Sequence, residues 1–426
     1  MRSEQSVPLS GYQKFVIFIL AITQFTVILD FMVMSPLGDM LMKALSLKPS
    51  AFGVAVSGYA ISAGISGLLT AAFADKFDRK KLLLFFYCGF IVGTIFCGLA
   101  HSYAALVAAR IVTGLFGGVI GSISMAIITD VFPLEKRGQV MSFIQMGFGA
   151  SQVLGVPIGI YIATLWQWEA PFWMVAGLSI LIAITIAMYL KPLTAHLALQ
   201  KGTSAFAHLG KTLSNSNYRI AFTSTALLSI GGFMMMPFGS TFAVNNLGVN
   251  YNQLTMLLMV SGISSLVVMP FVGKLSDKID KFKIFVAASV WMMITCVLYT
   301  NLGVTPLPLI MVFNIMMMIG VMSRMIPSSA LTSAIPDAAD RGAFMSINSS
   351  LQQIAGGIAA IAAGKIVTQA AKGAPLQHYN IVGYVIVVIS IISIGLMWRV
   401  DKMTKRKMEG SKPNAIPEDA FLPEGA

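Results

Sequence analysis

The chain has 426 residues, of which 56% are hydrophobic and only 11% are charged. Its mean hydropathy is +0.80, and such a composition lies well outside the range of soluble globular domains. A soluble fold is therefore excluded as the main architecture, and the formal net charge of +12 belongs to a protein that lies mostly in lipid.

Apolar stretches long enough to cross a bilayer recur along the whole chain. A spanning helix needs roughly 20 apolar residues. Twelve stretches meet this need, at about 15 to 37, 50 to 74, 82 to 100, 103 to 129, 139 to 164, 171 to 190, 219 to 244, 253 to 275, 282 to 302, 306 to 333, 343 to 369 and 380 to 398. The sequence therefore predicts an all-α membrane protein with twelve transmembrane helices. The N-terminal tail lacks the pattern of a cleaved signal peptide, so we expect the first helix to be retained.

The basic residues are unevenly distributed over the predicted loops. If the N-terminus is cytoplasmic, most of the 29 Lys and Arg lie in the tails and the cytoplasmic loops, as the positive-inside rule requires. We therefore expect both termini in the cytoplasm, and basic segments that contact anionic membrane lipids. This distribution accounts for the net charge without nucleic acid as a partner.

The sequence contains no residue set that points to catalysis. Its three Cys lie inside apolar stretches without metal-ligand or redox spacing, and its four His lie in predicted loops. The nucleotide-binding pattern G-x-x-x-x-G-K-S/T does not occur. We therefore expect neither an enzyme nor an ATP-driven pump, with no cofactor and no bound metal.

Two pairs of similar segments divide the chain into halves. AAFADKFDRKK (71 to 81) and GKLSDKIDKFK (273 to 283) each follow the second helix of a group of six. The pattern R-G-x-x-M-S likewise begins at Arg137 and again at Arg341, where the fifth helix of each group begins. Parallel six-helix repeats are one architecture of secondary transporters, in which the substrate binds between the repeats near the bilayer midplane.

The repeat and the longest polar break define the expected domains. These are a cytoplasmic N-tail (1–14), an N-terminal six-helix bundle (15–190), a cytoplasmic linker (191–218), a C-terminal six-helix bundle (219–398) and a cytoplasmic C-tail (399–426). The C-tail is basic near the membrane, and we expect it to be disordered beyond that point.

The first charged segment resembles the loop between helices two and three of the major facilitator superfamily, whose pattern is roughly G-x-L-a-D-r-x-G-r-k. Asp75 and Arg79 fit this pattern, whereas Ala71 and Asp78 replace its two Gly. The second copy keeps the first Gly and again has Asp, Asp280, in place of the second.

The resemblance implies that these loops control gating. Asp75 would face the N-terminus of the eleventh helix, where the helix dipole stabilises an anion. A solvated loop that only fixes topology is the alternative. The expected gating residues are Asp75, Lys76, Asp78, Arg79, Asp277, Lys278, Asp280, Arg137 and Arg341.

Two ionisable residues lie at similar depths inside predicted helices. Asp30 is the one acidic residue well within a span, and Arg110 lies in the fourth span. At 1.5 Å per residue, both fall in the outer half of the membrane, where ionisable groups are functional candidates. Because a nearby cation changes the proton affinity of a carboxylate, we predict that Asp30 and Arg110 form a pair that carries proton coupling. A permanent structural salt bridge is the alternative.

Helices four and five carry glycine patterns of the same superfamily. RIVTGLFGG, which begins at Arg110, resembles its motif R-x-x-x-G-x-x-x-G. GFGASQVLGVPIG (147 to 159) resembles its antiporter motif, although Val156 separates the Gly and the Pro that are usually adjacent. Small residues permit close helix packing, and Pro removes a backbone hydrogen bond. We expect packing or hinge roles for Gly114, Gly118, Gly147, Gly155, Pro157 and Gly159.

Together with ILDFMVMSPLGDML (28 to 41) and WQWEAPFW (166 to 173), the antiporter motif resembles the bacterial drug and sugar-efflux branch, including arabinose-efflux permeases. This resemblance implies a multi-pass protein of the bacterial inner membrane that exports its substrate.

Polar residues in the remaining spans are candidates for the substrate cavity. Arg324 has no acidic residue within the spans of its half. We expect it to face the cavity and bind an anionic group, with snorkelling to the headgroups as the alternative. The other candidates, for which interhelical hydrogen bonds are the alternative, are Gln24, Gln145, Gln152 and Asn314.

These observations predict a monomeric, proton-coupled exporter of a small molecule such as a drug, sugar or metabolite, with protons and membrane lipids as further partners. A facilitative or proton-symport importer is the first alternative. A sensor that does not transport is the second, and the lack of an additional soluble domain disfavours it.

Overall fold

The computed structural model describes residues 9–71, 73–194, 197, 205–337 and 340–410. Its first half, here the N-terminal half, contains α1 (Gly11–Val33), α2 (Gly38–Ala44), α3 (Pro49–Ala71), η1 (Ala74–Lys76), α4 (Arg79–Gly98), α5 (Tyr103–Val131), α6 (Leu134–Ala150), η2 (Ser151–Gly155), α7 (Val156–Leu165) and α8 (Ala170–Tyr189). After α9 (Ala205–Ser214), the C-terminal half contains α10 (Ser216–Phe233), η4 (Met236–Phe238), α11 (Gly239–Asn245), α12 (Tyr251–Lys278), α13 (Lys281–Thr300), α14 (Leu307–Ser333), α15 (Arg341–Ile366), β1 (Thr368–Gln369), β2 (Leu376–Gln377) and α16 (Tyr379–Gly410).

Eleven helical segments of the described chain are long and apolar enough to cross a membrane. The predicted span at about 343 to 369 corresponds to α15, whose 26 residues extend over about 39 Å but include several Ser, Asn and Gln. The predicted all-α membrane fold is therefore confirmed. The short hairpin of β1 and β2, which links α15 to α16, was not predicted.

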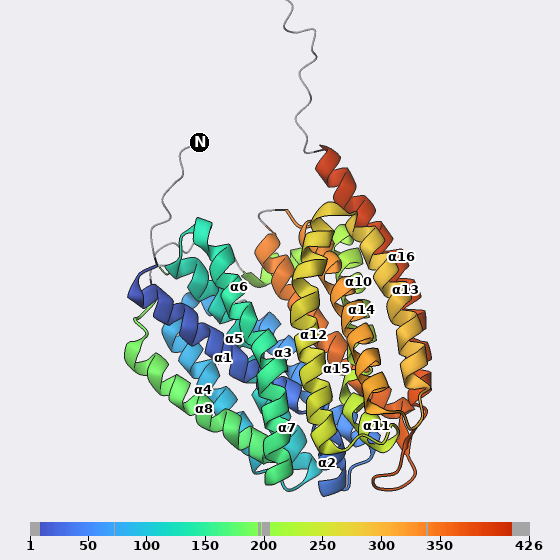
Figure 1. Cartoon of the computed structure of the whole chain (residues 1–426). Helices are drawn as coiled ribbons and strands as arrows, with labels where there is room; N and C mark the ends of the chain where they lie inside the picture. Colours follow the sequence, from blue (N-terminus) through green and yellow to red (C-terminus); the bar gives the residue numbers. More distant parts are fainter. Residues whose placement is uncertain (1–8, 72, 195–196, 198–204, 338–339, 411–426) are drawn as a thin grey trace, which may run out of the picture.

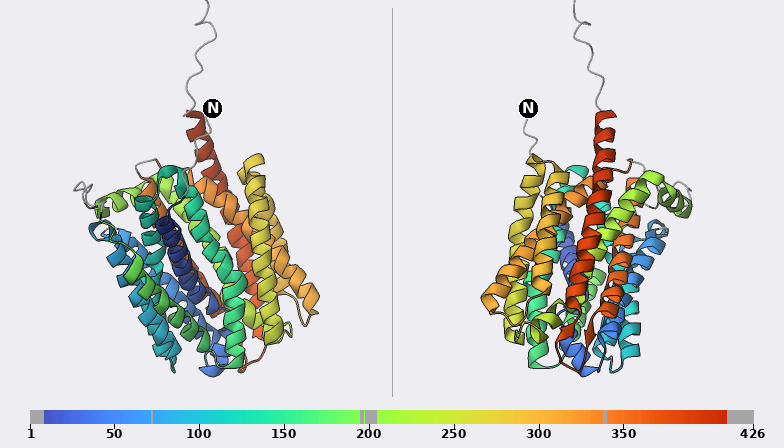
Figure 2. Two further views of the ribbon diagram at one scale, coloured as in Figure 1. Left: turned by 60° about the vertical axis from the view of Figure 1, so that its left-hand side comes forward. Right: turned by 90° about the vertical axis from the view of Figure 1, so that its right-hand side faces the viewer.

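The two ends of the molecule are distinguished by the chain termini. The first helix begins and α16 ends at the same end of the bundle, at the top of Figure 1. We call this the inner end, because the distribution of basic residues predicts that it faces the cytoplasm, and we call the opposite end the outer end. Figure 2 shows that α16 extends beyond the other helices at the inner end.

The first span of each half is broken near the outer end. The sequence predicted continuous helices at about 15 to 37 and 219 to 244, but α1 stops at Val33 and α10 stops at Phe233. Pro36 and Pro237 follow these ends, and Pro lacks an N–H donor and clashes with the preceding turn of a helix. The short helices α2 and α11 therefore run separately at the outer end (Figure 1).

The fifth span of the N-terminal half is a helix in three parts. Its middle part, η2, is a π-helix that ends at Gly155, two residues before Pro157. Pro157 has no backbone N–H to donate to the preceding turn, and the wider π-turn accommodates this missing hydrogen bond. Such turns are frequent at functional sites. The hinge role of Pro157 stays a prediction.

The most extensive contacts between the two halves are made by α3 and α12. The α3 helix packs along α15, and α12 packs mainly against η2 and α7 near the outer end (Figure 1). A Cβ atom on Gly64 of α3 would lie 2.6 Å from Cγ1 of Ile354 and 2.7 Å from the carbonyl oxygen of Ser350, both in α15. The absence of a side chain at Gly64 therefore permits this close crossing.

Candidate functional site

The structure brings Asp30 and Arg110 together in the interior of the N-terminal half. Nη1 of Arg110 in α5 donates to Oδ2 of Asp30 in α1 at 2.7 Å, and the two side chains are 1% and 0% exposed. Thr94 of α4 donates its hydroxyl to Oδ1 of Asp30 at 3.2 Å. The site thus lies where α1, α4 and α5 meet, and it is closed to solvent.

A tyrosine that the sequence reasoning missed covers the cation. The guanidinium carbon of Arg110 lies 4.6 Å from the ring centroid of Tyr59 in α3, within the range of a cation–π interaction. The Tyr59 ring lies 5.2 Å from the ring of Phe31, which lies 6.1 Å from that of Phe233 in the C-terminal half. No local sequence pattern marks Tyr59, because its role depends on the rotation of α3 against α5.

The predicted glycines lie where helices of the N-terminal half touch. Gly114 and Gly118 of α5 face α3, at Tyr59 and Ala63 respectively. This close approach of α5 to α3 places Arg110 against the Tyr59 ring. The glycines of the fifth span face α1, where added Cβ atoms would meet Ala21, Leu29 and Val33 from Gly147, Gly155 and Gly159 respectively.

The second Asp of each charged segment is a helix N-cap. Oδ1 of Asp78 accepts from the backbone N–H of Lys80 at 2.8 Å, at the start of α4, and from that of Leu193 at 3.0 Å. Oδ1 of Asp280 accepts from Phe282 and Lys283 at 2.9 and 3.1 Å, at the start of α13.

Asp280 also ties its loop to the end of α16. Its Oδ2 lies 2.7 Å from Nζ of Lys405, and this hydrogen bond is the main reason that the pKa of Asp280 is below its ordinary value. The contact resembles that of Asp78 with Leu193, which follows α8. Each capping Asp therefore binds the end of the sixth span of its own half.

The other predicted gating residues have varied surroundings. Arg79 is buried, donating to Asp130 at 3.3 Å and to the carbonyl of Ala74 at 3.2 Å. Arg137 donates to the carbonyls of Thr129 and Phe132 at the end of α5. Lys76, Lys278 and Arg341 are exposed. The side chains of Asp75, Asp277 and the cavity candidate Gln145 lie outside the part of the structure that is described.

Arg324 is buried within the C-terminal half. Its side chain in α14 is 4% exposed, and its guanidinium lies 5.7 Å from the ring of Phe285 in α13. Nε and Nη2 have no hydrogen-bond partner among the described atoms. Gly320, one turn earlier on the same face, contacts Met292 of α13. Arg324 therefore points toward α13, and its role in an anion site stays a prediction.

The remaining cavity candidates differ in how well their polar atoms are satisfied. Gln152 accepts from the hydroxyl of Ser265 in α12 at 2.9 Å, a bond between the two halves. Asn314 donates to the carbonyl of Ile310 at 3.0 Å. Oε1 of Gln24 is buried without a hydrogen-bond partner among the described atoms. Gln24 thus retains a free acceptor.

A second buried carboxylate, Asp39 in α2, lies at the outer end. It is 2% exposed and accepts from Tyr251 at 2.5 Å, from Lys43 at 2.7 Å and from Asn245 at 2.7 Å. We call these four residues the Asp39 cluster. The sequence reasoning did not select Asp39, although this acid lies in an apolar run soon after Pro36, which marks the end of the first helix.

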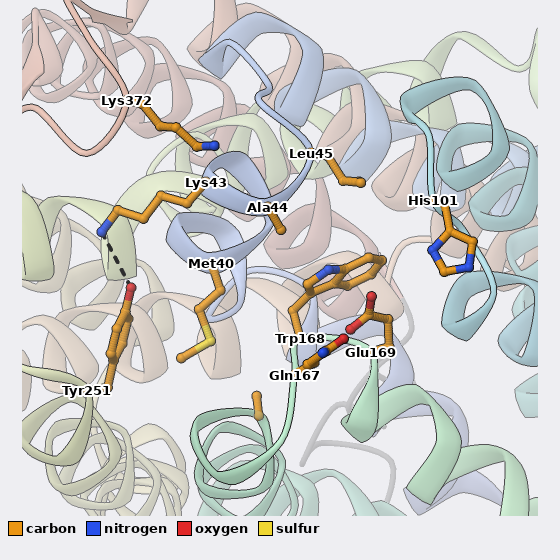
Figure 3. Close-up of a pocket in the computed structure, with 11 residues that line it drawn as sticks. Met40, Lys43, Ala44, Leu45, His101, Gln167, Trp168, Glu169, Tyr251 and Lys372 are labelled. Carbon is orange, nitrogen blue, oxygen red and sulfur yellow. Dashed lines mark hydrogen bonds between the residues drawn. The ribbon is translucent and has the colours of Figure 1, made fainter.

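A cavity of about 880 Å³ opens at the outer end beside this cluster. Residues of both halves line it, and Figure 3 shows Lys43 reaching toward the hydroxyl of Tyr251 at its edge. The lining residues are Met40, Lys43, Ala44, Leu45, His101, Ala163, Gln167, Trp168, Glu169, Tyr251 and Lys372. The cavity therefore connects two members of the Asp39 cluster to the outer surface.

The fold and these sites define a helical membrane protein whose two halves meet beside a buried ion pair. The sequence model described as Major Facilitator Superfamily matches residues 20–235 and again residues 221–418. The chain therefore belongs to the major facilitator superfamily. It is a secondary transporter of small solutes and not an enzyme, as the sequence predicted.

Bacterial proteins are among its relatives. The uncharacterized MFS-type transporter YbcL of Bacillus subtilis is 27% identical over 264 residues, which cover 62% of this chain and 66% of that protein. A probable sugar efflux transporter of Helicobacter pylori strain G27 is 27% identical over 187 residues, which cover 43% of this chain and 48% of the relative. The aligned regions thus span about half to two thirds of these relatives.

Solved transporter structures share the fold. A D-xylose-proton symporter has a TM-score of 0.77 at 16% identity, covering 93% of this chain and 99% of its own. A bacterial homolog of the human lysosomal transporter Spinster, in an inward-facing and unoccupied conformation, has a TM-score of 0.75 at 14% identity and covers 94% and 99%. At these identities the likeness establishes the fold alone.

Proposed function

We propose that the protein is a proton-coupled exporter, an antiporter that exchanges protons for a small organic molecule such as a drug, a sugar or a metabolite. The observation that carries this proposal is the buried pair of Asp30 and Arg110. The glycine-rich fifth span and the similarity to a probable sugar efflux transporter favour export. The bacterial relatives support a place in a bacterial inner membrane, with both termini in the cytoplasm.

The geometry of the pair suits reversible protonation. Only Nη1 of Arg110 donates to Asp30, and Nε has no hydrogen-bond partner among the described atoms. A buried salt bridge that serves stability alone needs its remaining donors satisfied. When Asp30 takes up a proton, the ring of Tyr59 still stabilises the guanidinium. Arg110 therefore keeps a favourable contact in both charge states of Asp30.

The contacts between the halves suit a transport cycle that begins at the inner end. The Asp39 cluster and the bond from the Ser35 hydroxyl to the carbonyl of Met236 join the halves at the outer end. In the proposed cycle, substrate enters from the cytoplasm and Asp30 is protonated from the outside. The halves then rock, and the substrate leaves on the outer side.

The proposal is tested with purified protein in proteoliposomes under an imposed pH gradient. Uptake of a panel of sugars and drug-like cations is measured together with proton flux reported by a pH-sensitive dye. We expect Asp30→Asn to abolish uphill transport, because the pair then lacks a group that titrates, while membrane insertion and downhill exchange persist.

Thr94→Val is the matched control for this test. This substitution removes the hydrogen bond that the uncharged hydroxyl of Thr94 donates to the same carboxylate. The variant is expected to retain coupling. Full uphill transport by Asp30→Asn would refute the role of Asp30.

A further inference from the structure

The cavity at the outer end, here called the outer cavity, is lined by both halves. The N-terminal half contributes α2 and the loops before α5 and α8, and the C-terminal half contributes the start of α12 and the loop between β1 and β2. Its volume of about 880 Å³ lies within the range of small-molecule sites. The outer cavity is therefore large enough for a ligand that contacts both halves.

Glu169 places an unsatisfied carboxylate oxygen in the wall of this cavity. Its Oε2 is buried and has no hydrogen-bond partner among the described residues. Glu169 occupies the N-cap position of α8, but its side chain makes no capping hydrogen bond. A buried charged oxygen without a donor is costly. Helix capping therefore does not account for this carboxylate, whereas a donor from a ligand would satisfy it.

The residue before Glu169 provides a fixed aromatic surface. Trp168 is 7% exposed, and its ring packs edge-on against that of Phe172 in α8 at a centroid distance of 6.3 Å. Trp168 and Glu169 both line the outer cavity. A cation near an indole ring is attracted by the quadrupole of the ring. This side of the cavity therefore suits a primary ammonium group, which also brings three N–H donors.

Two lysines lie on the opposite side of the outer cavity (Figure 3). Nζ of Lys43 lies 2.7 Å from the carboxylate of Asp39, so its charge is already paired. Nζ of Lys372 donates to the hydroxyl of Ser46 at 3.3 Å, and it pairs with no carboxylate in the part of the chain that the structure describes. Because an ammonium group has three donors, Lys372 keeps donors for an anionic group.

We propose that the outer cavity binds a small zwitterion such as an amino acid, with its ammonium group between Glu169 and Trp168 and its carboxylate at Lys372. A ligand with a positive charge alone would be repelled by Lys372, and one with a negative charge alone would be repelled by Glu169. Because Glu169 and Lys372 belong to different halves, the bound zwitterion links the halves and holds the outer end closed. The inference does not depend on proton coupling by Asp30 and Arg110.

Binding of ω-amino acids to the purified protein tests the proposal. The series runs from glycine through γ-aminobutyrate to ε-aminocaproate, because a longer chain separates the two charges further. Each member is compared with the amine and the carboxylate of the same chain length by isothermal titration calorimetry in detergent. We expect at least one zwitterion to bind about tenfold more tightly than both of its singly charged analogues, as one additional hydrogen bond to a charged group implies.

Variants of the two charged residues assign the two contacts. Glu169→Gln and Lys372→Gln are each expected to weaken binding of that zwitterion about tenfold. Lys365→Gln is the matched control and should bind as the parent does, because Lys365 is exposed at the outer end of α15 and does not line the cavity. The proposal is overturned if no zwitterion binds more tightly than its analogues, or if Lys365→Gln weakens binding as much as Lys372→Gln. Thermal unfolding of each variant confirms that the protein is folded.

Thiol labelling measures whether the ligand links the halves. Thr241 of α11 is fully buried, and a Cβ on Gly38 of α2 would lie 3.2 Å from its hydroxyl, so Thr241→Cys becomes reactive when the outer end opens. The exposed Cys88 is replaced by Ser, and the reagent is a membrane-impermeant methanethiosulfonate applied to proteoliposomes. At about ten times its Kd, the zwitterion should slow labelling of Thr241→Cys about tenfold by mass action. Labelling of Val304→Cys should not change, because Val304 is 87% exposed. Equal rates for Thr241→Cys with and without the zwitterion would refute the link between the halves.

Asp30→Asn separates this inference from the proposed function. Asp30 is fully buried within the N-terminal half and does not line the outer cavity. The variant should therefore lose uphill transport but bind the zwitterion as tightly as the parent does. Loss of zwitterion binding in Asp30→Asn would place the ligand at the ion pair and would overturn its assignment to the outer cavity.

Discussion

Asp78 and Asp280 make structural contacts that their position in the family pattern does not suggest, and their gating role stays a prediction. The pattern of the superfamily has Gly at both places, and the added charges looked like parts of a gate. In the structure each carboxylate caps a helix and binds the end of the sixth span of its own half. These contacts predict that both residues contribute to the stability of their own half.

Replacement of Asp280 separates its two contacts. Asp280→Ala loses the N-cap and is expected to lower the free energy of unfolding by about 1 kcal/mol. Asp280→Asn keeps a capping side chain and loses only the ion pair with Lys405, whose side chain is 51% exposed, so its loss is expected to be smaller. Thermal unfolding in detergent measures both variants. Equal losses in Ala and Asn would show that the cap contributes nothing.

The pH dependence of these losses has a definite sign. The pKa of Asp280 in the folded protein lies below its ordinary value of 3.8, so the folded state favours the ionised group. Its contribution is fully present above about pH 5 and is lost as the pH falls below 3.8 through the folded pKa. The stability difference between the parent and Asp280→Asn should therefore shrink only in this acidic range.

The residues of the site differ in how far the sequence could predict them. Depth in a membrane follows from counting residues along a helix, and that count was enough to predict that Asp30 and Arg110 pair. The direction of a side chain around its helix depends on packing, so the contact of Arg324 with Phe285 could not be predicted from the sequence. The partners of Asp39 in the other half lie 206 and 212 positions away, and nothing local indicates them.

At the scale of elements, apolar length predicted where helices occur but not where they break. Pro36 and Pro237 end α1 and α10, and η2 precedes Pro157. A hydropathy count treats such Pro residues as part of one stretch, because it measures composition and not backbone hydrogen bonds. These breaks create α2 and α11, and thereby the outer contacts between the halves.

The crossing of α3 and α15 gives a prediction for one element. Gly64→Ala would place a methyl group 2.7 Å from a backbone oxygen of α15, which cannot move without shifting the helix. We expect a loss of about 1 to 3 kcal/mol in stability, the usual cost of overpacking. Gly177→Ala in α8 is the matched control, because a Cβ there meets nothing within 4 Å and Ala favours a helix. Equal effects of the two substitutions would contradict the close crossing.

At the scale of the whole molecule, α3 packs along α15 over much of its length, but most of the hydrogen bonds between the halves lie at one end. Where the structure describes both partners, the hydrogen bonds between the halves lie at the outer end, apart from that of Gln152 with Ser265. Alternating access requires that these outer contacts open while each half stays intact. Contacts between the halves and contacts within a half should therefore respond differently to a covalent link.

A pair of engineered cysteines tests this difference. Nζ of Lys372, in the loop between β1 and β2, lies 3.3 Å from the hydroxyl of Ser46 in the other half. In a background with Cys88→Ser, we expect Ser46→Cys with Lys372→Cys to be joined by a short thiol crosslinker. The link should abolish transport, because the outer end can then no longer open.

The control is a pair within one half. Thr368 and Gln377 are partners across the hairpin of β1 and β2, so the same crosslinker should join Thr368→Cys and Gln377→Cys without stopping transport. Reversal of the link by a reductant, if a disulfide crosslinker is used, should restore activity to the first pair. If the link between the halves left transport unchanged, the outer contacts would have to persist through the cycle, and neither the Asp39 cluster nor its neighbours would form a gate.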